Sequence, residues 1–262
     1  MTNGRLGSVV LEARGVSMQF AGLRACDDVT LSIRTGEVLG IVGESGSGKS
    51  TLLRCLGGIL QPTAGTVHLH LAEGAHRDLW AVDEATRVQI TRTSIGLVHQ
   101  NPRDGLMMDI TAGGNIVEPL MAAGARNYAA LRATAVDWMR RMELSLYHID
   151  RFPADFSGGM QKRLQIARCL VTGPRILLMD EPTGGLDVSV QARLLDLLRH
   201  LVKELAMAVI VVTHDLAVAR MLAERLLVMR AGQVVEAGLA DQLLEDPQHQ
   251  YTQMLVSAAL RL

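Results

Sequence analysis

The chain has 262 residues, of which 48% are hydrophobic and 20% charged, a composition that excludes an intrinsically disordered protein and allows one large domain or two small ones. Its 26 Lys and Arg residues against 27 Asp and Glu residues give a net charge of -1, which excludes both a polybasic and an acidic tail. Only 3% of the residues are aromatic, too few for a platform that stacks on nucleic-acid bases, so we expect no nucleic-acid partner.

No segment of the sequence is apolar enough to span a membrane. The longest uninterrupted apolar run, Leu205–Val212, falls well short of the about 20 residues that a bilayer-spanning helix needs, and Met1–Arg5 lead into no apolar signal segment. We therefore expect a cytoplasmic protein that touches a membrane only through a partner. The cysteines, Cys26, Cys55 and Cys169, show no C-x-x-C spacing, which argues against a disulfide framework and against a zinc site.

The first third of the chain is typical of strands. Several segments alternate apolar and polar residues, as half-buried antiparallel strands do, and one continuous apolar run between Gly36 and Gly43 indicates a fully buried strand. The pattern predicts strands at residues 10–20, 28–33, 37–42, 66–71 and 95–98, and a helix from Lys49 to about Leu56.

The middle third, from Pro102 to about Asp155, has a helical pattern, and the last third returns to alternating strands and helices. One helical stripe in the middle third is formed by Leu131, Ala135, Trp138, Met139 and Met142. In the last third we expect strands at 175–180 and 209–213, helices at 190–205 and 216–223, and a hairpin at 226–235 that turns at Ala231–Gln233.

Strands that alternate with helices indicate a mostly parallel sheet, so the helical block is interpreted as an inserted subdomain. We expect one domain over residues 1–262. Its predicted parts are an α/β core with an antiparallel portion (1–100 and 166–235), a helical subdomain (101–165) and a C-terminal helical tail (236–262).

A phosphate-binding loop is the most specific motif in the sequence. Gly43–Ser50 fits G-x-x-x-x-G-K-[ST], and it follows a predicted buried strand and precedes a predicted helix, as this motif requires. Its glycines let backbone amides turn toward an anion, the helix N-terminus adds its positive end, Lys49 reaches the β- and γ-phosphates, and Ser50 is a ligand for Mg²⁺. The predicted nucleotide-binding residues here are Gly43, Glu44, Ser45, Gly46, Ser47, Gly48, Lys49, Ser50 and Thr51.

Phe20, before the loop, could stack on adenine or equally be a core residue.

Two adjacent carboxylates end the apolar segment 175–180. Ligands of parallel sheets bind beyond the carboxyl ends of the strands, so Asp180 is placed to hold Mg²⁺ through water. Glu181 faces another direction and can polarise the attacking water as a general base. Taken alone, the pair could be a solvated strand end; together with the phosphate loop, it predicts a hydrolytic site.

Three further polar positions extend this site. Gln100 ends a predicted strand and can touch the metal or the water, and His214 ends another strand, where it can hydrogen-bond a γ-phosphate. Ser157 can cap a helix whose start carries two glycines, which makes a second anion site; the alternative is an ordinary Ser-capped helix. Since one chain carries one evident nucleotide loop, the second site suggests that it serves another subunit's γ-phosphate in a two-fold dimer.

Together these motifs resemble the ATP-binding-cassette (ABC) ATPases, over nearly the whole chain. The resemblance rests on their order along the chain: 43–50, Gln100, 157–161, Asp180–Glu181, Gly184–Asp187 and His214. It implies a RecA-like P-loop NTPase fold that hydrolyses ATP with Mg²⁺, with Ser50, Gln100 and Asp180 at the metal and Glu181, His214, Gln100 and Lys49 in catalysis. It also implies a second ABC subunit, expected to be an identical copy, whose ATP contacts Ser157, Gly158, Gly159, Met160 and Gln161, with Asp187 in the loop that links the two sites.

Within the family, segments 187–192 and 246–252 are similar to the oligopeptide and nickel importer branch. Four features depart from that branch: His99 before Gln100, Gly184–Gly185, Asp104–Leu106 and Ala112–Ile116. These departures resemble the ATP-binding subunit of the carbon–phosphorus lyase system, which implies the lyase core complex as partner. Two alternatives remain: an importer motor attached to a membrane permease, and a switch that binds ATP with little hydrolysis.

Overall fold

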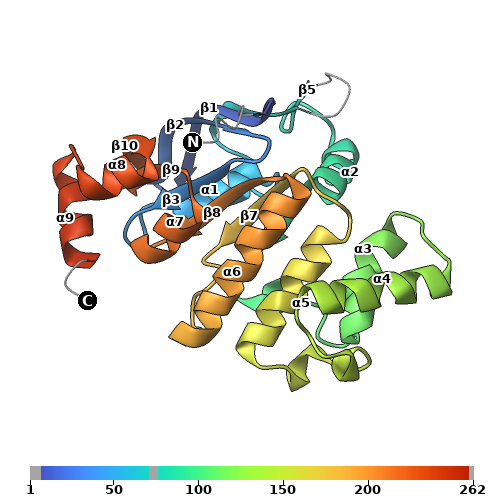
Figure 1. Cartoon of the computed structure of the whole chain (residues 1–262). Helices are drawn as coiled ribbons and strands as arrows, with labels where there is room; N and C mark the ends of the chain where they lie inside the picture. Colours follow the sequence, from blue (N-terminus) through green and yellow to red (C-terminus); the bar gives the residue numbers. More distant parts are fainter. Residues whose placement is uncertain (1–6, 71–75, 260–262) are drawn as a thin grey trace.

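The computed structural model describes residues 7–70 and 76–259, and in it the smaller of two sheets packs over one face of the larger, with a group of helices to one side (Figure 1). The larger sheet has the strand order β10-β9-β3-β8-β7-β6 and the smaller has the order β2-β1-β4-β5. The strands are β1 (Val9–Phe20), β2 (Leu23–Arg34), β3 (Val38–Val42), β4 (Ala64–His70), β5 (His76–Asp78), β6 (Ile95–Val98), β7 (Ile176–Asp180), β8 (Ala208–Thr213), β9 (Arg225–Arg230) and β10 (Gln233–Leu239).

Helices cover the larger sheet and form the group at its side. The α-helices are α1 (Lys49–Leu56), α2 (Glu84–Ser94), α3 (Ala112–Ala122), α4 (Tyr128–Arg141), α5 (Gly158–Leu170), α6 (Val188–Leu205), α7 (Leu216–Leu222), α8 (Ala240–Glu245) and α9 (Gln250–Ala259). Short 3₁₀ turns lie at Pro102–Asp104, Leu146–His148 and Pro153–Asp155.

The centre of the larger sheet is parallel and buried on both faces. Strands β3, β7 and β8 are buried along their whole length, which explains why they read as continuous apolar runs rather than as alternating patterns. Alternate side chains of β3 enter two different cores: Val38 and Val42 face the core that contains α5, α6 and α7, whereas Leu39 and Ile41 face the core that contains α1 and the smaller sheet.

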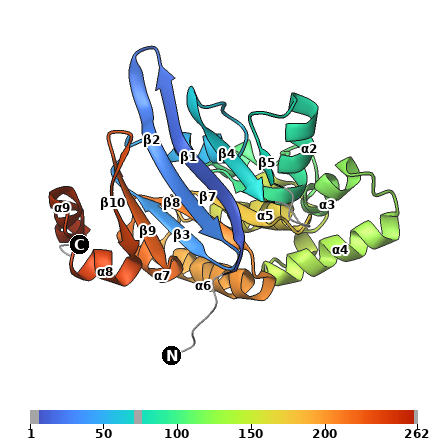
Figure 2. The same cartoon turned by 90° about the horizontal axis from the view of Figure 1, so that it is seen from above.

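The smaller sheet is antiparallel and is dominated by a long hairpin of β1 and β2, which Figure 2 shows reaching past the rest of the molecule. The predicted hairpin near the C-terminal part of the chain is also present, as β9 and β10. Its turn residues Ala231 and Gly232 both have positive φ, at 48° and 84°, as a tight turn between antiparallel strands requires.

The middle of the chain folds as helices α3, α4 and α5, which lie to one side of the sheets in Figure 1. The predicted stripe is confirmed, because its members are all buried: Leu131, Ala135, Trp138, Met139 and Met142. These side chains join the same core cluster as the α5 side chains Leu164 and Ile166.

Two of the predicted divisions fall inside elements of the structure. The division at 165/166 falls inside α5, which continues to Leu170 because its buried face packs against β6 and α6 as one surface. The tail start at residue 236 falls inside β10, so the helical tail begins at Ala240. Helix α2 and strand β5 were not predicted, and Leu71, at the end of the predicted strand 66–71, lies outside the described residues.

Within the described parts of the chain, none of the helices has the length and hydrophobicity needed to cross a bilayer.

Candidate functional site

Four neighbouring strands end at one edge of the larger sheet, and each delivers a predicted site residue there. The parallel order β3-β8-β7-β6 places their carboxyl ends side by side. The chain leaves β3 at Gly43, β8 at His214, β7 at Glu181 and β6 at His99, one residue before Gln100. Sequence positions far apart therefore meet at the place where ligands of parallel sheets bind.

The loop after β3 has the backbone that a phosphate cradle needs. Gly43, Gly46 and Gly48 have φ of 152°, 80° and 100°. A Cβ atom at Gly43 would overlap the carbonyl oxygen of Met229, and one at Gly48 would overlap that of Ala25. Gly48 is the N-cap of α1 and has no side chain to cap the first amides of the helix. The loop and helix start thus offer backbone N–H groups to an anion.

Lys49 lies buried inside this loop. Its ammonium donates to the carbonyl oxygens of Gly43 (2.8 Å) and Glu44 (2.7 Å) and to Ser47 Oγ (3.2 Å). Burial lowers the pKa of Lys49, and the nearby carboxylates Glu181 and Asp180 oppose that shift. The ammonium is therefore held where the phosphates of a nucleotide in the loop would lie.

Of the three residues predicted at the metal, Ser50 and Asp180 are brought together by α1 and β7, whereas Gln100 bonds Glu181 instead. Ser50 Oγ donates to Asp180 Oδ1 at 2.8 Å, and Asp180 is only 7% exposed. Burial raises the pKa of Asp180, while the hydrogen bond from Ser50 opposes that shift. One hydroxyl and one carboxylate beside a phosphate cradle fit Mg²⁺, which binds few protein oxygens and takes the rest from phosphates and water.

Glu181 connects two other strand ends. Its Oε1 is 2.8 Å from Nδ1 of His214, and its Oε2 accepts a hydrogen bond from Nε2 of Gln100 at 3.0 Å. The backbone of Glu181 has a positive φ of 44°, an uncommon conformation for a residue with a side chain. This turn directs Glu181 away from Asp180, so consecutive carboxylates have separate partners, as the sequence predicts.

The helix start at Ser157 is present as predicted, but two of its side chains turn inward. Ser157 Oγ accepts from Met160 N at 3.4 Å as the N-cap of α5. Met160 packs against the core, and the Gln161 amide donates to the carbonyl oxygens of Pro153 (2.8 Å) and Phe156 (3.2 Å). The exposed residues at this helix start are therefore Ser157 and Gly158, and Gly159 is buried.

Phe20 and Asp187 lie apart from the hydrogen-bonded group at the strand ends. Phe20 ends β1 and is 43% exposed, which leaves its ring available for stacking. Asp187 is the N-cap of α6 and accepts from Val190 N at 3.0 Å, a bond that lowers the pKa of Asp187. Thr51 follows Ser50 in the first turn of α1 and is half-buried.

Sequence reasoning missed two residues that contact the site. Lys162 of α5 donates to the carbonyl oxygens of His99 and Gln100. Tyr251 of α9 accepts a hydrogen bond from Glu44 N at 3.1 Å, and the guanidinium of Arg230 lies 4.9 Å from the centre of its ring. The sequence offers one signal for each of them. Lys162 is a lysine within a predicted helix, and Tyr251 lies in the tail segment 246–252, which by itself indicates only a branch of the family.

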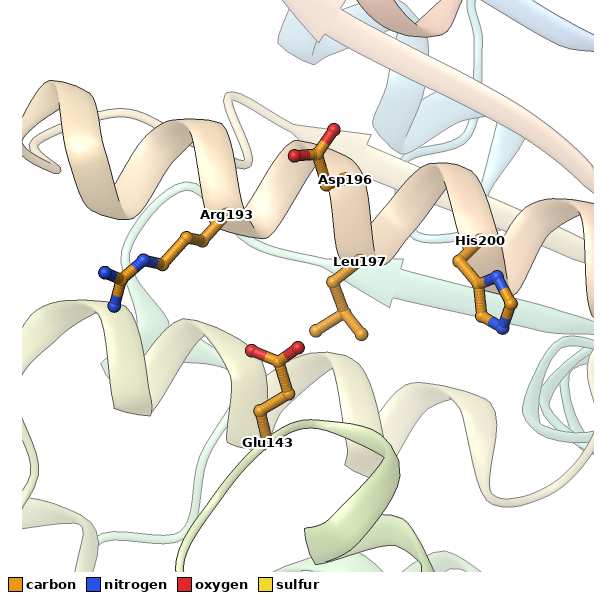
Figure 3. Close-up of a pocket in the computed structure, with 5 residues that line it drawn as sticks. All are labelled: Glu143, Arg193, Asp196, Leu197 and His200. Carbon is orange, nitrogen blue, oxygen red and sulfur yellow. The ribbon is translucent and has the colours of Figure 1, made fainter.

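Two hollows of the surface lie away from the strand ends. One, of about 490 Å³, lies between α6 and the turn after α4 (Figure 3) and is lined by Glu143, Arg193, Asp196, Leu197 and His200. The other, of about 280 Å³, lies on the smaller sheet beside His68, His70 and His76. Among the residues with described positions, no three His, Cys, Asp or Glu side chains are grouped to hold a metal.

Comparisons with known sequences agree with this geometry. A family profile described as "ABC transporter" matches residues 26–184. The putative phosphonates utilization ATP-binding protein PhnK of Escherichia coli (strain K12) is 56% identical over 252 residues, which cover 96% of this chain and 98% of that protein. The dipeptide transport ATP-binding protein DppF of the same organism is 38% identical over 240 residues, which cover 92% of this chain and 70% of that protein.

Solved structures share the fold. The dimeric post-hydrolysis state of the ATP-binding cassette MJ0796, bound to ADP and Pi, matches with a TM-score of 0.79 and 32% identity, covering 88% of this chain and 98% of that one. The structure of cbiO1 from Clostridium perfringens, described as part of the ABC transporter complex cbiONQ, matches with a TM-score of 0.78 and 26% identity, covering 97% of this chain and 96% of that one.

Proposed function

We infer the function of this protein from one premise: the chain belongs to the ABC transporter family and is an ATPase with the P-loop cassette fold. One observation carries the inference further. The phosphate loop and four polar side chains meet at one edge of the larger sheet: Asp180, Glu181, Gln100 and His214. We propose that this edge is where the protein binds and hydrolyses ATP, in the cytoplasm.

In this proposal each residue has a distinct task. The loop amides and Lys49 hold the β- and γ-phosphates, and Ser50 and Asp180 hold the magnesium ion, which when bound neutralises charge on the phosphates. Glu181 accepts a proton from the attacking water. Gln100 and His214, each bonded to one oxygen of Glu181, orient that carboxylate and contact the γ-phosphate side of the site.

We propose that two copies enclose two ATP molecules. Ser157 and Gly158 are exposed at the N-terminus of α5, where a partner's γ-phosphate could accept from backbone amides. A two-fold arrangement supplies both nucleotide sites with such a contact. Support comes from the cassette MJ0796, a structure described as dimeric.

We further propose that the ATP cycle serves the complex that cleaves the carbon–phosphorus bond of phosphonates. The supporting observation is the 56% identity to PhnK over 96% of the chain. The test is a pulldown of the tagged full-length chain against the lyase core subunits, with ATP, with ADP and without nucleotide. We expect association that depends on ATP; capture of a peptide-type permease and no lyase subunit would overturn the assignment.

A second candidate function is the motor of a peptide importer. It is favoured by the 38% identity to DppF over 92% of the chain. A pulldown of the same tagged chain against a dipeptide permease separates the two functions, because an importer motor must bind the permease and a subunit of the lyase system need not. A third candidate, an ATP-binding switch with little hydrolysis, requires that ATP turnover be unchanged by Glu181→Gln.

Nucleotide binding itself is tested by Lys49→Met. The substitution keeps an apolar stem of similar length but removes the charge that offsets the phosphates, so we expect the affinity for ATP to fall at least about a hundredfold. Binding of a fluorescent ATP analogue measures this. Lys203→Met, at an exposed position on α6, is the matched control and should bind like the wild type. Equal affinity of Lys49→Met and the wild type would place the nucleotide elsewhere.

A further inference from the structure

Lys162 is a buried lysine with an unusual set of partners. It lies on α5, is 1% exposed, and is one of the three lysines of the sequence, with Lys49 and Lys203. Its ammonium donates to the carbonyl oxygens of His99, at 2.8 Å, and Gln100, at 2.7 Å. Burying an ammonium is unfavourable unless it is well bonded, so this side chain is held here by the loop it contacts.

Gln165, one turn further along α5, holds the same loop. It is fully buried. In the amide orientation that satisfies its neighbours, its Nε2 donates to His99 O at 3.2 Å and its Oε1 accepts from His99 N at 3.0 Å. A Cβ atom at Gly105 would overlap the Gln165 side chain, so the chain after the loop also closes over this contact. Two side chains of α5 thus fix both polar backbone groups of His99.

The loop that Lys162 and Gln165 hold carries Gln100, whose side-chain amide reaches Glu181. Gln100 Nε2 donates to Glu181 Oε2 at 3.0 Å, so the backbone position of Gln100 decides whether this bond can form. Burial lowers the pKa of Lys162 to about 8, while Asp180 and Glu181 oppose that shift. The α5 contacts therefore include the backbone of the very residue whose side chain bonds the proposed general base.

The same helix begins at Ser157. Lys162 lies about one and a half helical turns beyond Ser157, on an uninterrupted helix that runs from Gly158 to Leu170. Because α5 is uninterrupted between these residues, it can carry a displacement of its exposed N-terminus to the carbonyls that Lys162 and Gln165 hold.

We propose that Lys162, assisted by Gln165, is a positioning residue that ties the His99–Gln100 backbone to α5, so that contact at the Ser157 end of the helix acts on the Gln100–Glu181 hydrogen bond. This inference rests on the proposed function, because it assigns the step by which the α5 terminus acts on hydrolysis in its own chain. Lys162 touches neither nucleotide nor water in this role; it acts through Gln100.

The test compares Lys162→Met with the wild type in the full chain, by ATP turnover and by binding of a fluorescent ATP analogue. A misplaced Gln100 amide should lower kcat by about ten- to a hundredfold, whereas the phosphate loop is untouched and the affinity should stay within about twofold. Lys162→Arg, which restores a buried cation with donors, should recover most of kcat. Lys203→Met, an exposed lysine on α6, is the matched control and should equal the wild type.

Three results would overturn the inference: a wild-type kcat in Lys162→Met, a loss of nucleotide affinity as large as the loss of kcat, or no recovery in Lys162→Arg. If Lys162→Met does not fold, Gln165→Leu, which breaks the second contact to His99, is judged by the same split between kcat and affinity. A wild-type chain that does not hydrolyse ATP would instead refute the proposed function, so the two failures are distinguishable.

Discussion

At the end of β7, two consecutive carboxylates bond to different partners. Asp180 accepts from Ser50, whereas Glu181 meets Gln100 and His214. The separation depends on the left-handed backbone of Glu181, with φ of 44°, which costs about 1–3 kcal/mol at a residue with a side chain. Such a conformation persists because the surrounding structure fixes it: Glu181 N donates to Val212 O, and its carbonyl accepts from Gly184 N.

The buried carboxylate of Asp180 should lower stability in the absence of nucleotide. Burial raises the pKa of Asp180 above its value in the unfolded chain, so the folded state binds this proton more tightly and loses stability as pH rises through that interval. We expect Asp180→Asn to raise Tm at pH 7, by about 2–4 °C for each kcal/mol recovered, and to abolish ATP hydrolysis.

Thermal unfolding of the nucleotide-free variant and the wild type at several pH values measures this effect. The difference in Tm should vanish below about pH 3, where Asp180 is protonated in both states. Asp196→Asn, at an exposed position on α6, is the matched control and should leave Tm unchanged. A Tm of Asp180→Asn that equals the wild type at pH 7 would contradict the prediction.

The three thiols should be unreactive in the folded protein. Burial raises the pKa of Cys26 to about 11 and the pKa of Cys55 and Cys169 to about 12. Since the thiolate is the reactive form, we expect reaction with Ellman's reagent at pH 8 to be at least about a hundredfold slower than in guanidinium chloride. One thiol that reacts at the denatured rate in the native protein would show that its site is open.

Sequence patterns revealed the site residues that belong to local motifs and missed those that reach it from a distance. The phosphate loop and the Asp180–Glu181 pair are recognisable because their chemistry needs particular residues at adjacent positions. Lys162 bonds to carbonyls 62 and 63 positions away, and Tyr251 to an amide 207 positions away. Such contacts depend on tertiary packing, which no short pattern encodes.

At the scale of single elements, Asn115 secures the segment that leads into α3. Its side chain is fully buried; Oδ1 accepts from Met107 N at 2.8 Å, and Nδ2 donates to the carbonyl oxygens of Met107 (2.9 Å), Ile110 (2.8 Å) and Thr111 (3.2 Å). This cluster gives a structural role to the segment Ala112–Ile116, which in the sequence is notable only as a departure from the importer branch. One amide pairs with Met107 N and Ile110 O, and it adds a second bond to the carbonyls of Met107 and Thr111, which also accept from Ile110 N and Asn115 N.

Asn115→Leu should therefore destabilise the fold by about 3 kcal/mol, because a side chain of similar volume leaves Met107 N and Ile110 O without their partner and removes two further bonds. Urea unfolding measures the change. Gln89→Leu, which places the same residue at an exposed position on α2, should alter the free energy of unfolding by less than about 0.5 kcal/mol. Equal effects of the two substitutions would show that the Asn115 bonds add nothing.

Elements were predictable where burial imposes a period or a continuous apolar run. The bounds of α1 and β6 agree with the prediction to the residue, because a glycine loop or a buried run delimits each. Helix α2 was missed because only Ser94 among its residues is buried, so it carries no apolar stripe. Strand β5 spans only His76–Asp78 and has no buried residue to mark it.

At the scale of the whole molecule, the proposed dimer makes a direct prediction. Glu181→Gln should bind ATP without hydrolysing it, so with ATP and Mg²⁺ the variant should double its molar mass in gel filtration with light scattering. The wild type with ADP should remain a monomer, because the γ-phosphate contact is missing. Adding Ser157→Arg to Glu181→Gln should abolish the dimer by blocking the α5 terminus. A monomer of Glu181→Gln at saturating ATP would refute the composite site.

The strand order of the larger sheet also constrains how the chain can mature during synthesis. Strand β3, which leads into the phosphate loop, has β8 and β9 as its neighbours, and both come from the last quarter of the sequence. Because the ribosome releases the chain starting from its N-terminus, this apolar strand is exposed long before either neighbour has been translated. The nucleotide cradle is thus a late product of translation, and stalled nascent chains shorter than about residue 230 should present β3 to chaperones.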